Sequence, residues 1–145
     1  MAADEVLPAT NDPDSAGFWE HTKEHKLVVQ KCDSCGHHRF PPHPYCPECR
    51  SADVSWAPVS GRGKIWTYAF VYKPMIPAFA SSTPYPVVYV ELDDHPTLRM
   101  TGNLVSHPGE AINSVNQDLV RIGAEVEVVF DEVSDDVTLP RWRLV

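Results

Sequence analysis

The sequence predicts a mainly β protein with an N-terminal helix, a small zinc ribbon and a five-stranded barrel. All four cysteines lie in one stretch, residues 32–49. Ahead of it, a short segment that holds two neighbouring aromatic residues has a helix start signal. Beyond residue 63, stretches rich in β-branched and aromatic residues alternate with proline, glycine and aspartate, which is the pattern of a small all-β domain.

Composition limits the classes of function. The 145 residues carry a net charge of −8, and only residues 21–50 are mildly basic, with five bases and three acids. A nucleic-acid-binding face normally concentrates positive charge, so this balance disfavours DNA and RNA as partners. No apolar run approaches the ~20 residues that cross a bilayer, and the acidic N-terminus does not resemble a secretion signal. We expect a soluble, cytoplasmic protein without a membrane partner.

The predicted organisation has three parts. Residues 1–13 are acidic, contain two prolines and lack an apolar period, so we expect a disordered arm. Residues 14–60 are assigned to the helix and the ribbon, and residues 61–145 to the barrel. The boundary lies in the Ser-Gly-Arg-Gly stretch at residues 60–63, which is typical of a flexible joint.

The helix is predicted over residues 15–24, with Asp14 or Ser15 as its cap. Phe18 and Trp19 are adjacent within it, and adjacent side chains on a helix diverge by about 100°. One flat core face therefore cannot easily bury both. Either one packs on the ribbon and the other stays partly exposed, or one docks into another subunit.

The zinc ribbon is predicted from cysteine spacing. Two Cys-x-x-Cys pairs are separated by ten residues, and four thiolates around one ion are typical of tetrahedral zinc. Because four protein ligands close the coordination shell, the metal is expected to be structural. Two disulfides, a redox pair or an iron site are the alternatives, and they fit the sequence less well. The ligands of this rubredoxin-like ribbon are Cys32, Cys35, Cys46 and Cys49.

Neighbouring histidines are not needed in that shell. His37, His38 and His43 lie between the two pairs and are interpreted as surface or supporting residues. His21 and His25 lie one helical turn apart but lack a third ligand, so a solvated helix face is the better interpretation. The strands of the ribbon are expected at residues 26–31, 38–40 and 54–59.

Five further strands and one interruption suit a barrel of the OB type. The interruption at residues 109–120 has a helix-like spacing of Ile112, Val115 and Leu119 and is expected to cap one end of the barrel. Pro140 indicates an edge or a bend in the last strand. The strands are predicted at residues 64–72, 87–92, 97–104, 126–130 and 138–144.

The loop at residues 73–86 is too long for a hairpin connection. Loops beyond about twelve residues usually have a binding role or cover a core. Its apolar side chains Met75, Ile76 and Phe79 are therefore either folded over the barrel or offered to a partner.

Alternating aromatic residues mark the first barrel strand. They could form a stacking platform for single-stranded nucleic acid, or they could fill the barrel interior, which is the commoner use of such alternation. The acidic balance of the chain favours the interior. These residues are Trp66, Tyr68, Phe70 and Tyr72.

The sequence contains no recognisable catalytic constellation. It has no Gly-rich phosphate loop, no Gly-x-Ser-x-Gly elbow and no His-Glu-x-x-His helix. All cysteines are assigned to the metal. Asp93, Asp94 and His95 could be an acid–base group, but Asp-Asp-His-Pro between two strands is interpreted as a turn. We predict no catalytic residue in this chain.

An ordered set of short motifs resembles a known family. The chain has Phe-Trp in a helix, Leu-x-x-x-x-Cys-x-x-Cys-Gly, Pro-Pro before Cys-Pro-x-Cys, Ser-Gly-x-Gly-x-Ile, Pro-Tyr-Pro-Val-Val and Ile-Gly-x-x-Val-x-Val-x-Phe, from about Phe18 to Trp142. This resembles the zinc-ribbon plus OB-fold proteins associated with acyl-CoA enzymes, once catalogued as a domain of unknown function.

The resemblance implies a non-catalytic subunit that completes a thiolase-fold acyl-CoA enzyme of the sterol-carrier-protein type, as a heterotetramer. The activity implied is retro-aldol cleavage of steroid side-chain CoA thioesters or a related acyl transfer, with acyl-CoA at or near the interface. The partner would contact Phe18, Trp19, Met75, Ile76 and Phe79. Positive side chains that could meet CoA phosphates are Arg62, Lys64, Lys73 and Arg99. A zinc-ribbon and OB module for single-stranded nucleic acid is the alternative function.

Overall fold

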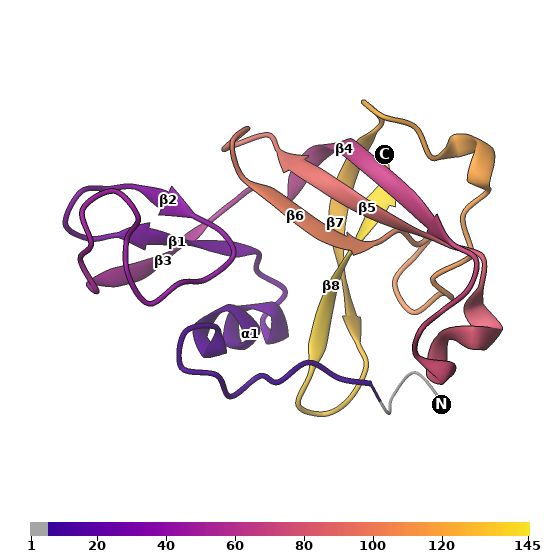
Figure 1. Cartoon of the computed structure of the whole chain (residues 1–145), viewed down its shortest axis with the longest axis horizontal. Coiled ribbons are helices and arrows are strands. Elements are labelled where there is room, and N and C mark those ends of the chain that lie inside the picture. The colour runs from indigo at the N-terminus through magenta and orange to yellow at the C-terminus, as the bar shows by residue number, and fades with distance from the viewer. Residues whose placement is uncertain (1–5) are drawn as a thin grey trace.

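A computed structural model describes residues 6–145 as two antiparallel sheets with one helix packed beside them (Figure 1). The arm predicted over residues 1–13 lies partly outside the described residues, and residues 6–12 form no helix or strand. Within the described part of the chain, no helix is long and apolar enough to cross a membrane.

Helix α1 (Ala16–Lys23) lies where the sequence predicts it. Ser15 precedes it but makes no side-chain cap, and the carbonyl of Asp12 instead accepts the N–H groups of Ser15 and Ala16. The helix approaches the ribbon very closely: a Cβ added at Gly17 would lie 2.0 Å from Nε1 of Trp56. Only glycine permits this distance.

The ribbon is a three-stranded sheet in the order β2-β1-β3. Its central strand pairs antiparallel with both neighbours, and Gln30 aligns with Arg39 on one side and Trp56 on the other. The strands are β1 (Val28–Cys32), β2 (His38–Arg39) and β3 (Val54–Pro58).

The second sheet has five antiparallel strands in the order β6-β5-β4-β7-β8 and gives the expected OB-fold. Figure 1 shows β4 and β5 crossing over β7 and β8, so the sheet is strongly curved. Pro140 lies in β8, which is an edge strand as predicted. The strands are β4 (Arg62–Val71), β5 (Tyr85–Leu92), β6 (Arg99–Asn103), β7 (Glu125–Glu132) and β8 (Thr138–Leu144).

The sheet does not close fully into a barrel. Its edge strands β6 and β8 meet at an isolated parallel bridge between Leu104 and Trp142, where the Val105 N–H also donates to the Trp142 carbonyl at 2.9 Å. The Arg141 side chain adds a hydrogen bond to Asn103 Oδ1 at 3.0 Å. Toward the other end of the two strands, α1 lies next to the resulting seam (Figure 1).

One hydrophobic core serves both sheets. Phe18 of α1 and Val29 of the ribbon are buried in the same cluster as Ile65, Val90 and Trp142 of the OB-fold. The ribbon therefore covers part of its apolar surface with the OB-fold. The domain boundary at residues 60 and 61 stays a prediction.

Polar and aromatic contacts add to this core. His38 of β2 stacks on His95 with 4.2 Å between ring centroids, and the Ser60 hydroxyl donates to Asp94 at 2.6 Å. His95 and Asp94 both belong to the turn between β5 and β6, which is the turn that the sequence predicts there. At the end of α1, His25 stacks on Phe130 at 5.2 Å.

The segment at residues 109–120 differs from expectation. In place of a helix it contains turns and one short 3₁₀ element, η3 (Gln117–Leu119). Gly109 has a φ of 85°, and the side chain of Asn116 accepts the Asp118 N–H. Such turn-forming residues compete with helix formation. Ile112 is nevertheless buried and Val115 packs against the core, but Leu119 is 56% exposed. The apolar spacing therefore identified two contact residues of the three and predicted the wrong backbone.

Candidate functional site

The four cysteines converge as the spacing predicts. Cys32 ends β1 and the others lie in two loops, and all four Sγ atoms are within 4.8 Å of one another. Sγ of Cys32 lies 3.5 Å from that of Cys49, and Sγ of Cys35 lies 3.6 Å from that of Cys46. Sulfur atoms at about 2.3 Å from a tetrahedral zinc are about 3.8 Å apart, so this thiol set fits Zn²⁺.

The two cysteine loops share one backbone design. The Gly36 N–H donates to the Cys32 carbonyl at 2.9 Å, and the Arg50 N–H donates to the Cys46 carbonyl at 2.8 Å. Both donors have left-handed backbones, with φ of 80° at Gly36 and 65° at Arg50. The loops thus present their thiols from equivalent turns, and the centre is a structural zinc site.

Backbone N–H groups tune the thiols. The N–H of Cys35 is the main cause that lowers the pKa of Cys32, to about 6. Burial acts in the opposite direction, and the N–H of Ser34 lowers the pKa further. For Cys35 the His37 N–H lowers the pKa most, but burial and contacts with the other thiols outweigh it and raise the pKa to about 12. The thiols thus affect one another's ionisation through their short S···S contacts, and metal binding releases their protons.

The histidines near the zinc site make other contacts. The His43 backbone N–H donates to Gln30 Oε1 at 2.8 Å, and His38 stacks on His95. His21 Nδ1 lies 2.6 Å from the Gly17 carbonyl, and His25 Nε2 lies 3.0 Å from Glu132 Oε1. Among residues 6–145, the cysteines form the one group of three or more side chains placed to hold a metal.

The residues predicted to contact a partner are not equally accessible. Phe18 is only 5% exposed, because it packs in the shared core. Trp19 is partly exposed, and its ring meets that of Phe18 edge-on at 5.1 Å. This burial does not support a docking role for Phe18, whereas Trp19 remains a candidate.

The loop between β4 and β5 has an outer and an inner side. Met75 is 99% exposed and Ile76 is 45% exposed, just before the 3₁₀ element η2 (Pro77–Ser82). Phe79 instead packs in a second cluster, with its ring 6.1 Å from that of Tyr85. The loop therefore covers a core with Phe79 and exposes an apolar tip, Met75 and Ile76, whose contact with a partner stays a prediction.

An exposed aromatic patch lies where the sequence predicted barrel interior. A β-bulge between Ile65 and Thr67 shifts the register of β4, and Trp66 is 46% exposed. The Trp66 ring meets Tyr89 edge-on at 5.7 Å, and Arg99 Cζ lies 4.1 Å from its centroid. The expectation of interior aromatics was wrong for Trp66, Tyr68 and Tyr72, which are exposed, whereas Phe70 is partly buried and packs against the core.

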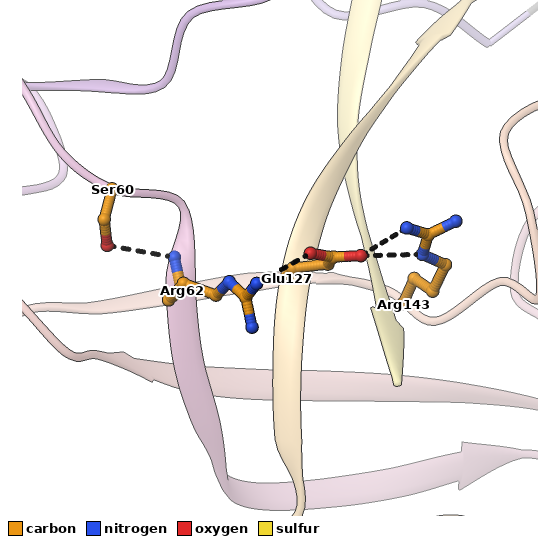
Figure 2. A network of polar contacts seen from close by, with 4 residues as sticks. All are labelled: Ser60, Arg62, Glu127 and Arg143. Carbon is orange, nitrogen blue, oxygen red and sulfur yellow. Dashed lines mark hydrogen bonds and ion pairs between the residues drawn. The ribbon is translucent and has the colours of Figure 1, made fainter. Parts of the chain in front are cut away.

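The four candidate CoA-binding bases have different surroundings. Arg62 pairs with Glu127 at 3.6 Å, and Arg143 Nε bonds the same carboxylate at 3.0 Å (Figure 2). These guanidinium groups lower the pKa of Glu127, with the Arg143 hydrogen bond as the main cause. Arg99 is stacked on Trp66. Lys64 forms no ion pair within the described range and is exposed, and the same holds for Lys73.

Two family models match consecutive parts of the chain. The rubredoxin-like zinc ribbon domain of ChsH2 matches residues 19–55, and the C-terminal OB-fold domain of ChsH2 matches residues 56–131. Together they cover the zinc centre and most of the five-stranded sheet.

Curated relatives extend these matches. A probable enoyl-CoA hydratase alpha subunit from Thermomonospora curvata is 35% identical over 94% of this chain, and a 3-oxo-4,17-pregnadiene-20-carboxyl-CoA hydratase alpha subunit from Mycobacterium tuberculosis is 29% identical over 97%. The chain spans only 39% of the length of each. The benzoylsuccinyl-CoA thiolase subunit BbsA from Thauera aromatica is 28% identical over 76% of this chain and 67% of its own length.

A solved structure has the same architecture over nearly the whole chain. It is a chain of the Ltp2-ChsH2(DUF35) aldolase, with a TM-score of 0.79 and 33% identity. The similarity covers 95% of this chain and 98% of that chain. Helix, ribbon and OB-fold therefore recur together, as one unit.

Proposed function

This chain belongs to the family of ChsH2 zinc-ribbon and OB-fold proteins, and from that premise we propose that it is a non-catalytic subunit of a thiolase-fold acyl-CoA enzyme. The observation that carries the proposal is the likeness to a chain of the Ltp2-ChsH2(DUF35) aldolase over 95% of this chain. The names of three relatives refer to CoA thioesters, which agrees with an acyl-CoA substrate.

The chemistry of the chain suits support better than catalysis. Its four thiols are engaged by one metal with a closed shell, which leaves no position for a substrate or an activated water. The zinc fixes the ribbon, and the ribbon and α1 pack on the OB-fold. The partner would then supply the catalytic acid, base or cysteine. A reducing compartment such as the cytoplasm would keep these thiols free for the metal.

Two surfaces are proposed for the partner. One is the exposed tip of the β4–β5 loop, Met75 and Ile76, and the other is the partly exposed Trp19 on α1. Large apolar side chains at exposed positions are typical of residues that become buried on association. Phe18 and Phe79 would act indirectly, by holding α1 and the loop in place.

The proposed substrate is a steroid side-chain CoA thioester that is cleaved by a retro-aldol reaction, and a related acyl transfer is the second possibility. The pregnadiene-carboxyl-CoA relative supports the steroid, and the aldolase likeness supports the cleavage. A heterotetramer would hold acyl-CoA at the interface. Lys64 and Lys73 are the bases best placed to meet CoA phosphates, because Arg62 and Arg99 already have partners in this chain.

Co-expression with the thiolase-like protein encoded nearest to this chain tests the proposal. We expect both proteins and zinc in one size-exclusion peak, with activity on a CoA thioester that neither protein shows alone. Met75→Asp together with Ile76→Asp is expected to weaken the complex at least tenfold, whereas Ile122→Asp, at another exposed apolar residue, serves as the matched control.

Two outcomes would overturn the proposal. If the two proteins elute in separate peaks with zinc retained, this chain does not bind the proposed partner. If this chain alone is active on the CoA thioester, it is not a non-catalytic subunit. The patch of Trp66, Tyr89 and Arg99 is what the alternative nucleic-acid module would need, so the same protein should be titrated with single-stranded DNA at physiological salt. Tight binding there, lost in Trp66→Ala, would support that alternative.

A further inference from the structure

An apolar cavity of about 470 Å³ lies at the seam between β6 and β8. This volume falls within the roughly 300–1,000 Å³ of small-molecule sites. Four parts of the chain form the walls: the segment before the helix with Ala9 and Ser15, α1, the Phe40-Pro41-Pro42 stretch of the ribbon, and the two edge strands of the OB-fold. The cavity therefore exists only because the ribbon and the OB-fold are packed together around α1.

Gly102 and Trp142 lie close together at the cavity wall. A Cβ added at Gly102 would lie 3.0 Å from Nε1 and 2.8 Å from Cδ1 of Trp142, and both residues line the cavity. Near Leu104 the bridge to Trp142 joins the strands. Beyond it, Met100 and Pro140 face the cavity from opposite strands. The cavity thus lies where the edge strands β6 and β8 are not paired with each other.

The wall is uncharged. Its rings and aliphatic groups come from phenylalanine, tryptophan, proline, methionine, leucine and alanine, and no lining residue carries an ionisable side chain. The polar lining side chains are Ser15, Thr101 and Asn103, and Asn103 Oδ1 already accepts from Arg141 at 3.0 Å. An ion would lose its hydration here without gaining a counter-charge, so charged ligands are disfavoured.

One indole donor at the wall has no acceptor within residues 6–145. Trp142 is 1% exposed and its Nε1–H donates to no atom of these residues, yet Nε1 is not one of the fully buried unpaired atoms, which belong to Arg39, Arg99 and Arg141. A buried tryptophan N–H usually finds a hydrogen-bond partner. The Nε1 edge lies against Gly102 at the cavity wall, where a bound molecule could supply the acceptor.

We propose that this seam cavity binds a neutral, mainly apolar small molecule whose carbonyl or hydroxyl oxygen accepts a hydrogen bond from the indole N–H of Trp142. The rings and prolines contact the hydrocarbon part, and the absence of charge at the wall selects against carboxylates. Residues of this chain alone form the site, and one of them, Trp19, is also proposed above to contact the partner, so the probe is tested on the isolated chain.

Nuclear magnetic resonance of the zinc-loaded chain tests the site with 2-decalone as the probe. The indole N–H signals of the four tryptophans are assigned by Trp19→Phe, Trp56→Phe and Trp66→Phe, which leave the Trp142 signal by elimination. We expect a saturable downfield shift of the Trp142 signal. The hydrocarbon decalin should bind about tenfold more weakly without that shift, as one hydrogen bond is lost.

Decanoate and a filled cavity provide the controls. Decanoate should bind at least tenfold more weakly than 2-decalone. Thr101→Phe, which puts a ring at the cavity wall, should abolish the shift, whereas Thr97→Phe, at an exposed position outside the wall, should preserve it. Equal affinity for ketone and hydrocarbon, equal binding of decanoate, or a shift that persists in Thr101→Phe would overturn the assignment, as would a Trp142 signal that no probe moves.

Discussion

The ribbon and the OB-fold reach a fixed structure by different means. The OB-fold sheet has strands of five to ten residues and a core of buried aliphatic residues such as Ile65, Val88 and Val90. The ribbon sheet has strands of two to five residues, and its loops are fixed by four thiols. The ribbon therefore depends on a metal and on a core that it shares with the OB-fold, whereas the OB-fold depends mainly on its own apolar residues.

Zinc removal should have the largest effect, and it should affect the ribbon much more than the OB-fold. Structural zinc contributes apparent binding energies of about 10–16 kcal/mol in small zinc domains at pH 7, and this energy is folding energy. Cys46→Ser, or a strong chelator, should therefore unfold the ribbon loops while the OB-fold keeps its sheet. Amide spectra of the zinc-bound and zinc-free chain would show this. Equal loss of signals from β4 and β5 would mean that the OB-fold also requires the metal.

Phe18→Ala is expected to have the next largest effect, and it should affect both regions. Removal of a buried phenylalanine costs about 3–5 kcal/mol, and Phe18 lies in the core that the regions share. Denaturant unfolding of the zinc-loaded variant would measure the loss. Trp19→Ala is the matched control, because a partly exposed ring should cost clearly less. If Phe18→Ala destabilised the ribbon alone, the two regions would not share a core.

Protonation of His38 should loosen the contact between the regions by a smaller amount. Burial, followed by the positive charge of His95, Lys31 and His37, lowers the pKa of His38 below 6.5. The unfolded chain thus binds the proton more readily, so stability is complete above about pH 6.5 and declines as the pH falls toward the folded pKa.

His38→Gln tests that pH dependence. Unfolding midpoints of both proteins should be measured between pH 8 and pH 5, with the zinc content followed in parallel. We expect a shallower decline in the variant at equal zinc content. Identical slopes would show that other groups, such as the thiols, dominate the acid response.

Ser60→Ala should have the smallest effect of the series. The Ser60 hydroxyl and N–H hold Asp94 at 2.6 and 2.8 Å, and these bonds lower the pKa of Asp94. Loss of the hydroxyl should raise that pKa toward its ordinary value and cost no more than about 1 kcal/mol, because the pair is exposed. Carboxyl-carbon resonances across an acid titration would report the pKa. An unchanged Asp94 would mean that the backbone bond alone suffices.

Local patterns allowed most elements to be predicted. The cysteine spacing gave the zinc ligands, because each pair lies within one tight turn and the two turns share a design. Helix α1 (Ala16–Lys23) and the strands follow from short apolar runs bounded by turn residues. At residues 109–120 an apolar period suggested a helix, but glycine and asparagine determined the backbone instead.

Features that join distant parts of the chain could not be predicted. The bulge at Trp66 depends on how β4 pairs with β5, and it decides whether the aromatic side chains face in or out. The seam cavity requires α1, the ribbon and both edge strands at once. The burial of Phe18 likewise depends on packing between regions, so the sequence left open which of the two helix aromatics would be covered.

The close approach of Gly17 to Trp56 has a mechanical consequence. Because a Cβ would lie 2.0 Å from the indole nitrogen, one added methyl group would act as a wedge beneath α1. The helix is short, and Phe18 and Trp19 directly follow Gly17, so a tilt at Gly17 would displace their rings from the core and from the seam. The smallest residue of the helix thus sets the angle at which α1 lies on the ribbon.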